Sequence, residues 1–151
     1  MVPAFTGWGT PHWDPCSRGL IIGLTRDSRR GHIAKAALEG IALSVATLVQ
    51  LAEKAIGHPL GELAVDGGAA ASNPLLQAQA NCTGLDVRRP KNLESTAKGV
   101  ALLAGLQAGI INDFNELVPK RQEGAEIFTS TIDTQTREQW LSKWDNAVNE
   151  V

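Results

Sequence analysis

The residues best suited to chemistry form a short glycine turn near the middle of the chain. Gly67 and Gly68 closely follow an apolar run at residues 63–65, and Ser72 and Asn73 stand just after them, ahead of a proline. In an open α/β sheet, ligands settle beyond the carboxyl ends of strands, and two positions without side chains leave room there for a planar ring or a phosphate. The helix that follows would add unpaired N–H groups and a positive dipole end. This arrangement suits binding of a flat or anionic ligand.

A simpler interpretation of the same residues involves no ligand. Gly67 and Gly68 then make a tight turn, while Asn73 only caps the following helix, with Pro74 at its first position. Spacing alone favours this interpretation, because paired glycines before helices are common. The segment also matches neither a Walker loop nor the G-x-G-x-x-G dinucleotide fingerprint.

Other side chains that often do chemistry are assigned structural roles, and no catalytic residue is assigned. Three histidines share no metal-ligand spacing, so no metal site is predicted at His12, His32 or His58. Glu39 lies beside an apolar stripe, which favours a surface carboxylate or an intramolecular ion pair. Three neighbouring arginines are expected to be solvated: Arg26, Arg29 and Arg30. Cys16 and Cys82 are far apart in sequence, which favours reduced thiols in the cytoplasm.

The elements that must position the turn come from hydrophobic periodicity. An apolar run at residues 19–25 predicts a buried strand, and apolar residues at spacings of three and four predict a helix over residues 32–56, ended by Gly57. Residues 63–66 predict a strand that leads into the glycine turn. The helix opened by Asn73 is expected to end near Gly84, and residues 85–89 predict a further strand closed by Pro90.

The two ends of the chain are less regular. Residues 1–17 are rich in Gly and Pro and predict an irregular lead-in, whose tryptophan rings, Trp8 and Trp13, pack on the core. Ser95 is expected to cap a helix through Gln107, which its small residues predict to be buried. A looser polar region follows Gly109. A last helix from about Asp133 carries an apolar face that packs on the chain's own core, at Trp140, Leu141, Trp144, Ala147 and Val148.

Length and composition bound the class of protein. The chain has 151 residues, of which 43% are hydrophobic and 20% charged, with a net charge of −2. These values predict a soluble globular domain, and the absence of charge blocks argues against nucleic acid as a partner. The charge-free stretch from Gly40 to Ala52 is shorter than the roughly 20 apolar residues that span a bilayer, so no membrane partner is expected. Strands alternating with helices predict an α/β fold with a small, mainly parallel sheet.

Read as a whole, the sequence resembles the C-terminal part of the FGGY carbohydrate kinases. The resemblance begins at Val2-Pro3-Ala4-Phe5-Thr6-Gly7-Trp8-Gly9-Thr10-Pro11-His12-Trp13-Asp14-Pro15 and includes Asp66-Gly67-Gly68. The second family signature also fits, with Gly19, Ile21, Gly23 and Leu24 followed by His32, Ile33, Ala36, Ala37, Leu38 and Glu39. This resemblance implies part of a ribonuclease H-like, actin-like ATPase domain. Residues 1–151 would be the C-terminal portion of the nucleotide-side domain, with the N-terminal catalytic domain absent.

The resemblance also implies an activity and a site. The parent protein would transfer the γ-phosphoryl group of ATP to a primary hydroxyl of glycerol or a related polyol. Gly67, Gly68 and Ala69 would then lie against the adenosine, and either Ser72 or Asn73 would contact the base. Mg²⁺, the catalytic base, both phosphate-binding turns and the polyol contacts would belong mainly to the missing part. We therefore expect this chain alone to be inactive.

Two alternatives stay open at this point. The chain could be a non-catalytic interaction or oligomerisation module, in which the face that meets the missing domain is exposed and self-associates. It could also come from another FGGY kinase, acting on xylulose, erythritol or a different sugar, because the polyol contacts lie outside these residues.

Overall fold

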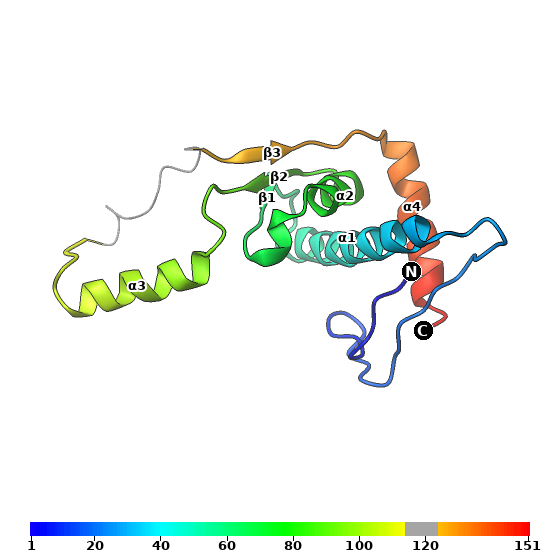
Figure 1. The fold of residues 1–151 in the computed structure, drawn as a ribbon, viewed down its shortest axis with the longest axis horizontal. Helices are drawn as coiled ribbons and strands as arrows, with labels where there is room; N and C mark the ends of the chain where they lie inside the picture. Colours follow the sequence, from blue (N-terminus) through cyan, green and yellow to red (C-terminus); the bar gives the residue numbers. More distant parts are fainter. Residues whose placement is uncertain (114–123) are drawn as a thin grey trace.

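The computed structural model describes residues 1–113 and 124–151, which form a small sheet and several helices, one of which packs against the sheet (Figure 1). In chain order the elements are α1 (Arg30–Ile56), β1 (Glu62–Ala64), the 3-10 helix η1 (Gly68–Ala71), α2 (Asn73–Thr83), β2 (Asp86–Arg89), α3 (Ser95–Gln107), β3 (Glu126–Phe128) and α4 (Thr134–Val148). Part of the polar region predicted after Gly109, residues 114–123, lies outside the described residues.

The long helix α1 confirms the prediction for residues 32–56 and begins two residues earlier. At its N-terminus the Arg29 N–H donates to Nδ1 of His32 at 3.2 Å, so this histidine serves the helix end. Gly57 ends the helix in the left-handed conformation, with φ 79°. Glu39 forms the expected intramolecular pair, with Lys35 Nζ 3.5 Å from its carboxylate.

The side of α1 that is buried is the one with small residues. Its buried positions are Gly40, Ala42, Ala46 and Val49. At Gly40 an added Cβ would stand 2.3 Å from the carbonyl oxygen of Met1, so the N-terminal segment crosses the helix where a side chain is missing. Larger apolar residues of the predicted stripe face outward instead, and are 39–47% exposed: Ile33, Ile41, Leu48 and Ile56. Much of the apolar surface of α1 is therefore uncovered in this chain.

The sheet within the described residues has three strands in the order β1-β2-β3. β1 runs parallel to β2 with Leu63 opposite Val87, as the alternation of strands and helices predicts. β2 pairs antiparallel with β3, with Val87 opposite Phe128. The sheet is therefore mixed. β3 was not predicted because its three residues are too few to show a pattern.

Helix α2 lies between the sheet and α1. On the sheet side, Leu76 and Ala80 pack with Val87 and Phe128 in one buried cluster. On the other side, Cys82 is buried with Ala42 and Ala46 of α1. Gly84 ends α2 with φ 75°, as the sequence predicts. Buried apolar contacts thus cover both faces of α2.

Helix α4 closes the fold from the other end of the chain. Asp133 caps it by accepting a hydrogen bond from the Thr136 N–H at 2.7 Å, which confirms the predicted start. Trp144 and Ala147 are buried with Val2 and Ala4, and the Trp8 ring meets Trp144 edge-on. The Trp144 Nε1–H donates to the Thr47 hydroxyl at 3.1 Å, which fastens α4 to α1. The prediction that this helix packs on the chain's own core is confirmed.

Two predictions for the N-terminal third are wrong. Residues 19–25 form no strand, because their one ladder contact is an isolated antiparallel bridge between Val2 and Leu20, and Gly23 turns the backbone to φ 76°. A strand requires a neighbour along its length, and no described residues supply one beyond Leu20. Trp13 does not pack on the core but is 73% exposed.

The prediction that α3 is buried is also wrong. Its bounds agree with the sequence, but none of its residues is buried, and Val100 and Leu103 are more than 60% exposed. In Figure 1 the helix projects away from the rest of the fold. An added Cβ at Gly99 would meet nothing within 4 Å, whereas one at Gly105 would stand 2.5 Å from the Ile111 side chain, just beyond the end of the helix. Its N-cap is Glu94, without a side-chain bond, rather than Ser95.

Of the helices in residues 1–113 and 124–151, α1 alone is long and apolar enough to cross a bilayer by length and composition. The prediction from sequence considered only the charge-free stretch of this helix, whereas a membrane-spanning helix tolerates one or two charged residues. This is weak evidence for a membrane span, because core helices of soluble proteins pass the same test. Here α1 packs along α2 and contacts α4.

Candidate functional site

The glycine turn lies where the sequence places it, directly beyond β1. The Val65 N–H donates to the Arg88 carbonyl at 3.1 Å and so keeps the chain beside β2 for one more residue. Gly67 then takes a left-handed conformation, with φ 78°, which favours glycine because a Cβ is strained there. Its N–H donates to the Leu93 carbonyl at 2.9 Å, which anchors the start of the turn to the loop before α3.

The outer surface of this turn is open. A Cβ added at Gly67 or Gly68 would meet nothing within 4 Å. Gly68 and Ala69 are exposed, whereas Ala70 is only 3% exposed and holds the inner side of η1. The chain's own packing therefore leaves space over Gly68 for a flat group, and the backbone there can be approached without displacing a side chain.

The start of α2 corrects one prediction. Ser72, not Asn73, is the N-cap, and its hydroxyl accepts a hydrogen bond from the Leu75 N–H at 3.4 Å. Serine and asparagine cap helices about equally well, so the sequence could not decide between neighbours. Pro74 still falls in the first turn, where its missing N–H has no acceptor in the helix. Asn73 is consequently exposed at the helix start, with its amide available to solvent.

A residue that the sequence analysis did not single out secures the far end of the turn. The Arg89 guanidinium Nη1 donates to the Ala70 carbonyl at 2.9 Å. Its Nη2 pairs with the Glu126 carboxylate, and the guanidinium carbon lies 5.1 Å from the centre of the Phe128 ring. An arginine just before the proline that closes β2 was the available signal, but both of these partners stand on β3, which was not predicted.

Three groups outside the turn have clearly shifted pKa values. Burial raises the pKa of the Cys82 thiol to about 12, with Glu39 adding to the rise. Hydrogen bonds from the Cys16 and Thr136 backbone N–H groups lower the pKa of Asp14 and of Asp133, respectively.

The other candidate side chains are dispersed over the fold. His12 lies against the Trp8 ring, His32 at the start of α1, and His58 just beyond its end. In the two described stretches, no three His, Cys, Asp or Glu side chains gather closely enough to hold a metal ion. Both cysteines are free, Cys16 exposed and Cys82 buried.

Comparison with known sequences connects this fold to a family. Residues 1–108 match the model of the C-terminal domain of the FGGY family of carbohydrate kinases. The chain is 44% identical to a glycerol kinase of Trichlorobacter lovleyi over 148 residues, which cover 98% of this chain and 30% of that protein. It is 45% identical to glycerol kinase 2 of Saccharolobus solfataricus, again over 98% of this chain and 30% of the relative. The chain spans about a third of the length of these curated relatives.

Solved structures agree with the sequence comparison. The crystal structure of Plasmodium falciparum glycerol kinase with ADP superposes with a TM-score of 0.81 and 31% identity, over 99% of this chain and 30% of that one. A ligand-bound xylulose kinase from Lactobacillus acidophilus gives a TM-score of 0.73 at 23% identity, over 99% of this chain and 30% of that one. The likeness confirms the α/β fold class, part of an actin-like ATPase domain, that the sequence resemblance implies. The chain belongs to the FGGY family of carbohydrate kinases.

Proposed function

We propose that this chain is the C-terminal, adenosine-binding portion of an ATP-dependent glycerol kinase. The observation that carries the proposal is the 44–45% identity to glycerol kinases over 98% of the chain. The open glycine turn supports it physically, because it leaves a backbone surface free where a donor nucleotide of an α/β sheet would settle. The ADP in the Plasmodium crystal structure supports an adenine nucleotide as that donor.

In this proposal the adenosine lies against Gly67, Gly68 and Ala69. The two glycines offer no side chain to hold the purine away, and Ala69 is exposed beside them. Ser72 and Asn73 remain the candidates for a contact with the base. The Ser72 hydroxyl already accepts the Leu75 N–H, so the exposed amide of Asn73 is the better donor and acceptor for a purine.

The rest of the reaction is assigned to the remainder of the longer protein. ATP supplies the γ-phosphoryl group, and Mg²⁺ held through its phosphates neutralises the charge that develops on transfer. The base, the phosphate-binding turns and the contacts to glycerol would come from an N-terminal catalytic domain. The exposed apolar faces of α1 and α3, which include Leu48 and Leu103, support a larger fold that covers them.

We assign the parent enzyme to the cytoplasm. Free thiols at Cys16 and Cys82 are compatible with a reducing compartment. The apolar length of α1 is then explained by packing inside a larger domain rather than by a bilayer.

A chimeric enzyme tests the proposal directly. The 148-residue region of the Trichlorobacter glycerol kinase that matches this chain is replaced by this chain. We expect the chimera to release ADP in a glycerol-dependent manner, whereas the same enzyme truncated before that region, and this chain by itself, do not. A soluble chimera that binds glycerol but releases no more ADP than the truncated enzyme would overturn the proposal.

The interaction-module alternative is favoured by one specific observation, the uncovered apolar side of α1 with Ile41 and Leu48 at 40% and 47% exposure. Light scattering on the purified chain, with and without ATP, separates the two candidates. A stable oligomer whose mass and melting temperature do not change with ATP supports the interaction-module alternative. A chain whose melting temperature rises with ATP supports the nucleotide-binding portion.

A further inference from the structure

We infer that Arg89 is a positioning residue for the nucleotide turn, acting through its hydrogen bond to the carbonyl of Ala70. The inference rests on the proposed function, because the turn it positions is the proposed adenosine surface. A Cβ added at Gly68 would meet no atom within 4 Å, Arg89 included, whereas the Arg89 guanidinium bonds the Ala70 carbonyl, so its role is to fix the backbone that the nucleotide meets.

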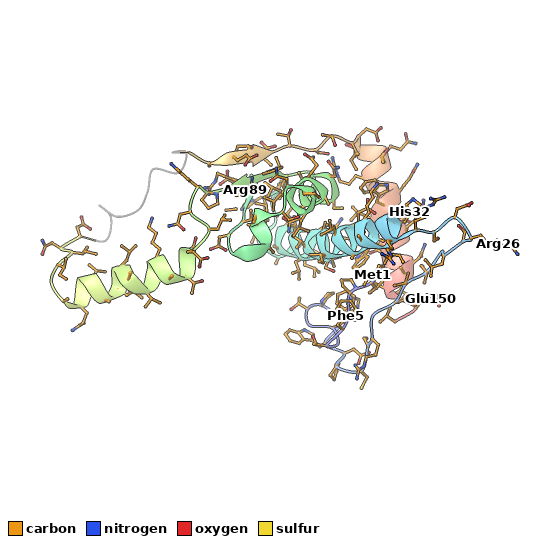
Figure 2. All side chains as sticks on the ribbon, viewed as in Figure 1. Met1, Phe5, Arg26, His32, Arg89 and Glu150 are labelled. Carbon is orange, nitrogen blue, oxygen red and sulfur yellow. The ribbon has the colours of Figure 1, made fainter. Side chains whose placement is uncertain are left out.

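The guanidinium of Arg89 uses its two terminal nitrogens for different partners. Nη1 donates to the Ala70 carbonyl at 2.9 Å, and Nη2 pairs with Glu126. The group lies over the Phe128 ring, and only 15% of the Arg89 side chain is exposed. Figure 2 shows Arg89 beside the sheet, close to the segment that carries η1. A planar fork with fixed donor directions can serve two acceptors at once, whereas a lysine ammonium is a single point charge.

The turn is held at both of its ends, by the last residue of β2 and by the segment that follows this strand. At the start, the Leu93 carbonyl accepts the Gly67 N–H at 2.9 Å, and at the end Arg89 donates to the Ala70 carbonyl. Between these two anchors stand Gly68 and Ala69, whose outer side is open. Glycines supply no side-chain packing, so the conformation of this stretch depends on its two anchoring hydrogen bonds more than the conformation of an ordinary turn does.

Removal of the Arg89 anchor is expected to weaken ATP binding without changing the chemical step. A turn that samples several conformations binds with an affinity reduced by the fraction of time it spends in the competent one. We therefore expect Arg89→Met to raise KM for ATP about tenfold, the change that corresponds to a competent fraction of roughly a tenth. KM for glycerol and kcat are expected to stay within about twofold, because Arg89 contacts no reacting group.

A purely structural role is the competing explanation, since Arg89 also joins β2 to β3. Glu126→Gln separates the two, because it removes the charge of the β3 partner and leaves the bond to Ala70. We expect Glu126→Gln to lower the melting temperature of the chimera defined above and to keep KM for ATP within about twofold. Arg89→Lys is expected to preserve the charge next to Glu126 and Phe128 but still to raise KM for ATP.

The measurement is therefore steady-state kinetics in both substrates, with a thermal melt of each variant. The inference is overturned if Arg89→Met leaves KM for ATP near the parent value, or if Glu126→Gln raises it equally. If Arg89→Met does not fold, Arg89→Lys replaces it in the test, and a KM for ATP near the parent value then overturns the inference. An inactive parent chimera refutes the proposed function, and this inference with it. An active parent whose Arg89 variants bind ATP normally refutes the inference alone.

Discussion

Substitution at Gly68 separates the proposed nucleotide surface from the stability of the fold. Gly68 has no left-handed φ, and a Cβ there would meet nothing within 4 Å. Gly68→Val should therefore change the free energy of unfolding by no more than about 0.5 kcal/mol, as at ordinary surface positions. That corresponds to a shift of about 1–2 °C in Tm for a domain of this size. The valine side chain would therefore fit without a steric clash.

The same side chain would stand where the purine lies in the proposal. Burial of apolar surface contributes about 25 cal/mol per Å², so a purine that loses roughly 80 Å² of contact here loses about 2 kcal/mol, and KM for ATP should rise about 30-fold. The assay is ATP-dependent phosphorylation of glycerol by the chimera, with a thermal melt of each variant.

A matched control is available at Gly61, another position with no left-handed φ and open space around it. Gly61→Val is expected to leave both Tm and KM unchanged. Gly67→Val is expected to lose stability instead, by roughly 1–3 kcal/mol, because Gly67 has φ 78° and ψ 179°, a conformation that is essentially restricted to glycine. Our reasoning is refuted if Gly68→Val binds ATP like the parent, or if Gly61→Val weakens binding as much as Gly68→Val does.

Three further predictions concern the fold. Leu76→Ala should lower the free energy of unfolding by about 2–5 kcal/mol in a denaturant titration, because Leu76 is 1% exposed between α2 and the sheet; a loss under about 1 kcal/mol would contradict that packing. In the native chain Cys16 should react with a thiol reagent and Cys82 should not until unfolding, since Cys82 is 1% exposed and its pKa is about 12; equal labelling rates would contradict this. Asp133→Asn should remove a pH-dependent part of the stability, because the pKa of the Asp133 carboxyl is lowered in the folded state. The stability that this carboxylate contributes is present above its ordinary pKa of 3.8 and is lost as the pH falls through its lower pKa in the folded state. Melts of both forms at pH 7 and in acid should therefore converge in acid, and a difference that persists there would exclude this origin.

The helices could be predicted because their signals are local. Gly57, Gly84 and Asp133 each mark a helix end by a backbone preference or a cap that needs no distant partner. Exposure was harder to predict, because it depends on what covers a surface. The larger apolar residues of α1, such as Ile41 and Leu48, and the small residues of α3 do suggest burial, and none of them is buried in this chain.

The candidate site divides in the same way. The place of Gly67 and Gly68 beyond a strand could be predicted, because an apolar run followed by paired glycines is a local pattern. The anchors at Leu93 and Arg89 could not, because each joins the turn to a segment about 20 residues further along the chain. Glu126, the ion-pair partner of Arg89, lies still further along the chain from the turn.

The cluster that joins Val2 and Ala4 to Trp144 and Ala147 bears on synthesis of the chain. Val2 and Ala4 are translated before almost all the rest of this sequence, so their apolar side chains emerge from the ribosome long before their partners on α4. During that interval Val2 and Ala4 are exposed to chaperones and to other nascent chains. A stop codon or a translational pause shortly before α4 should thus impair folding of the chain more than the small size of α4 suggests.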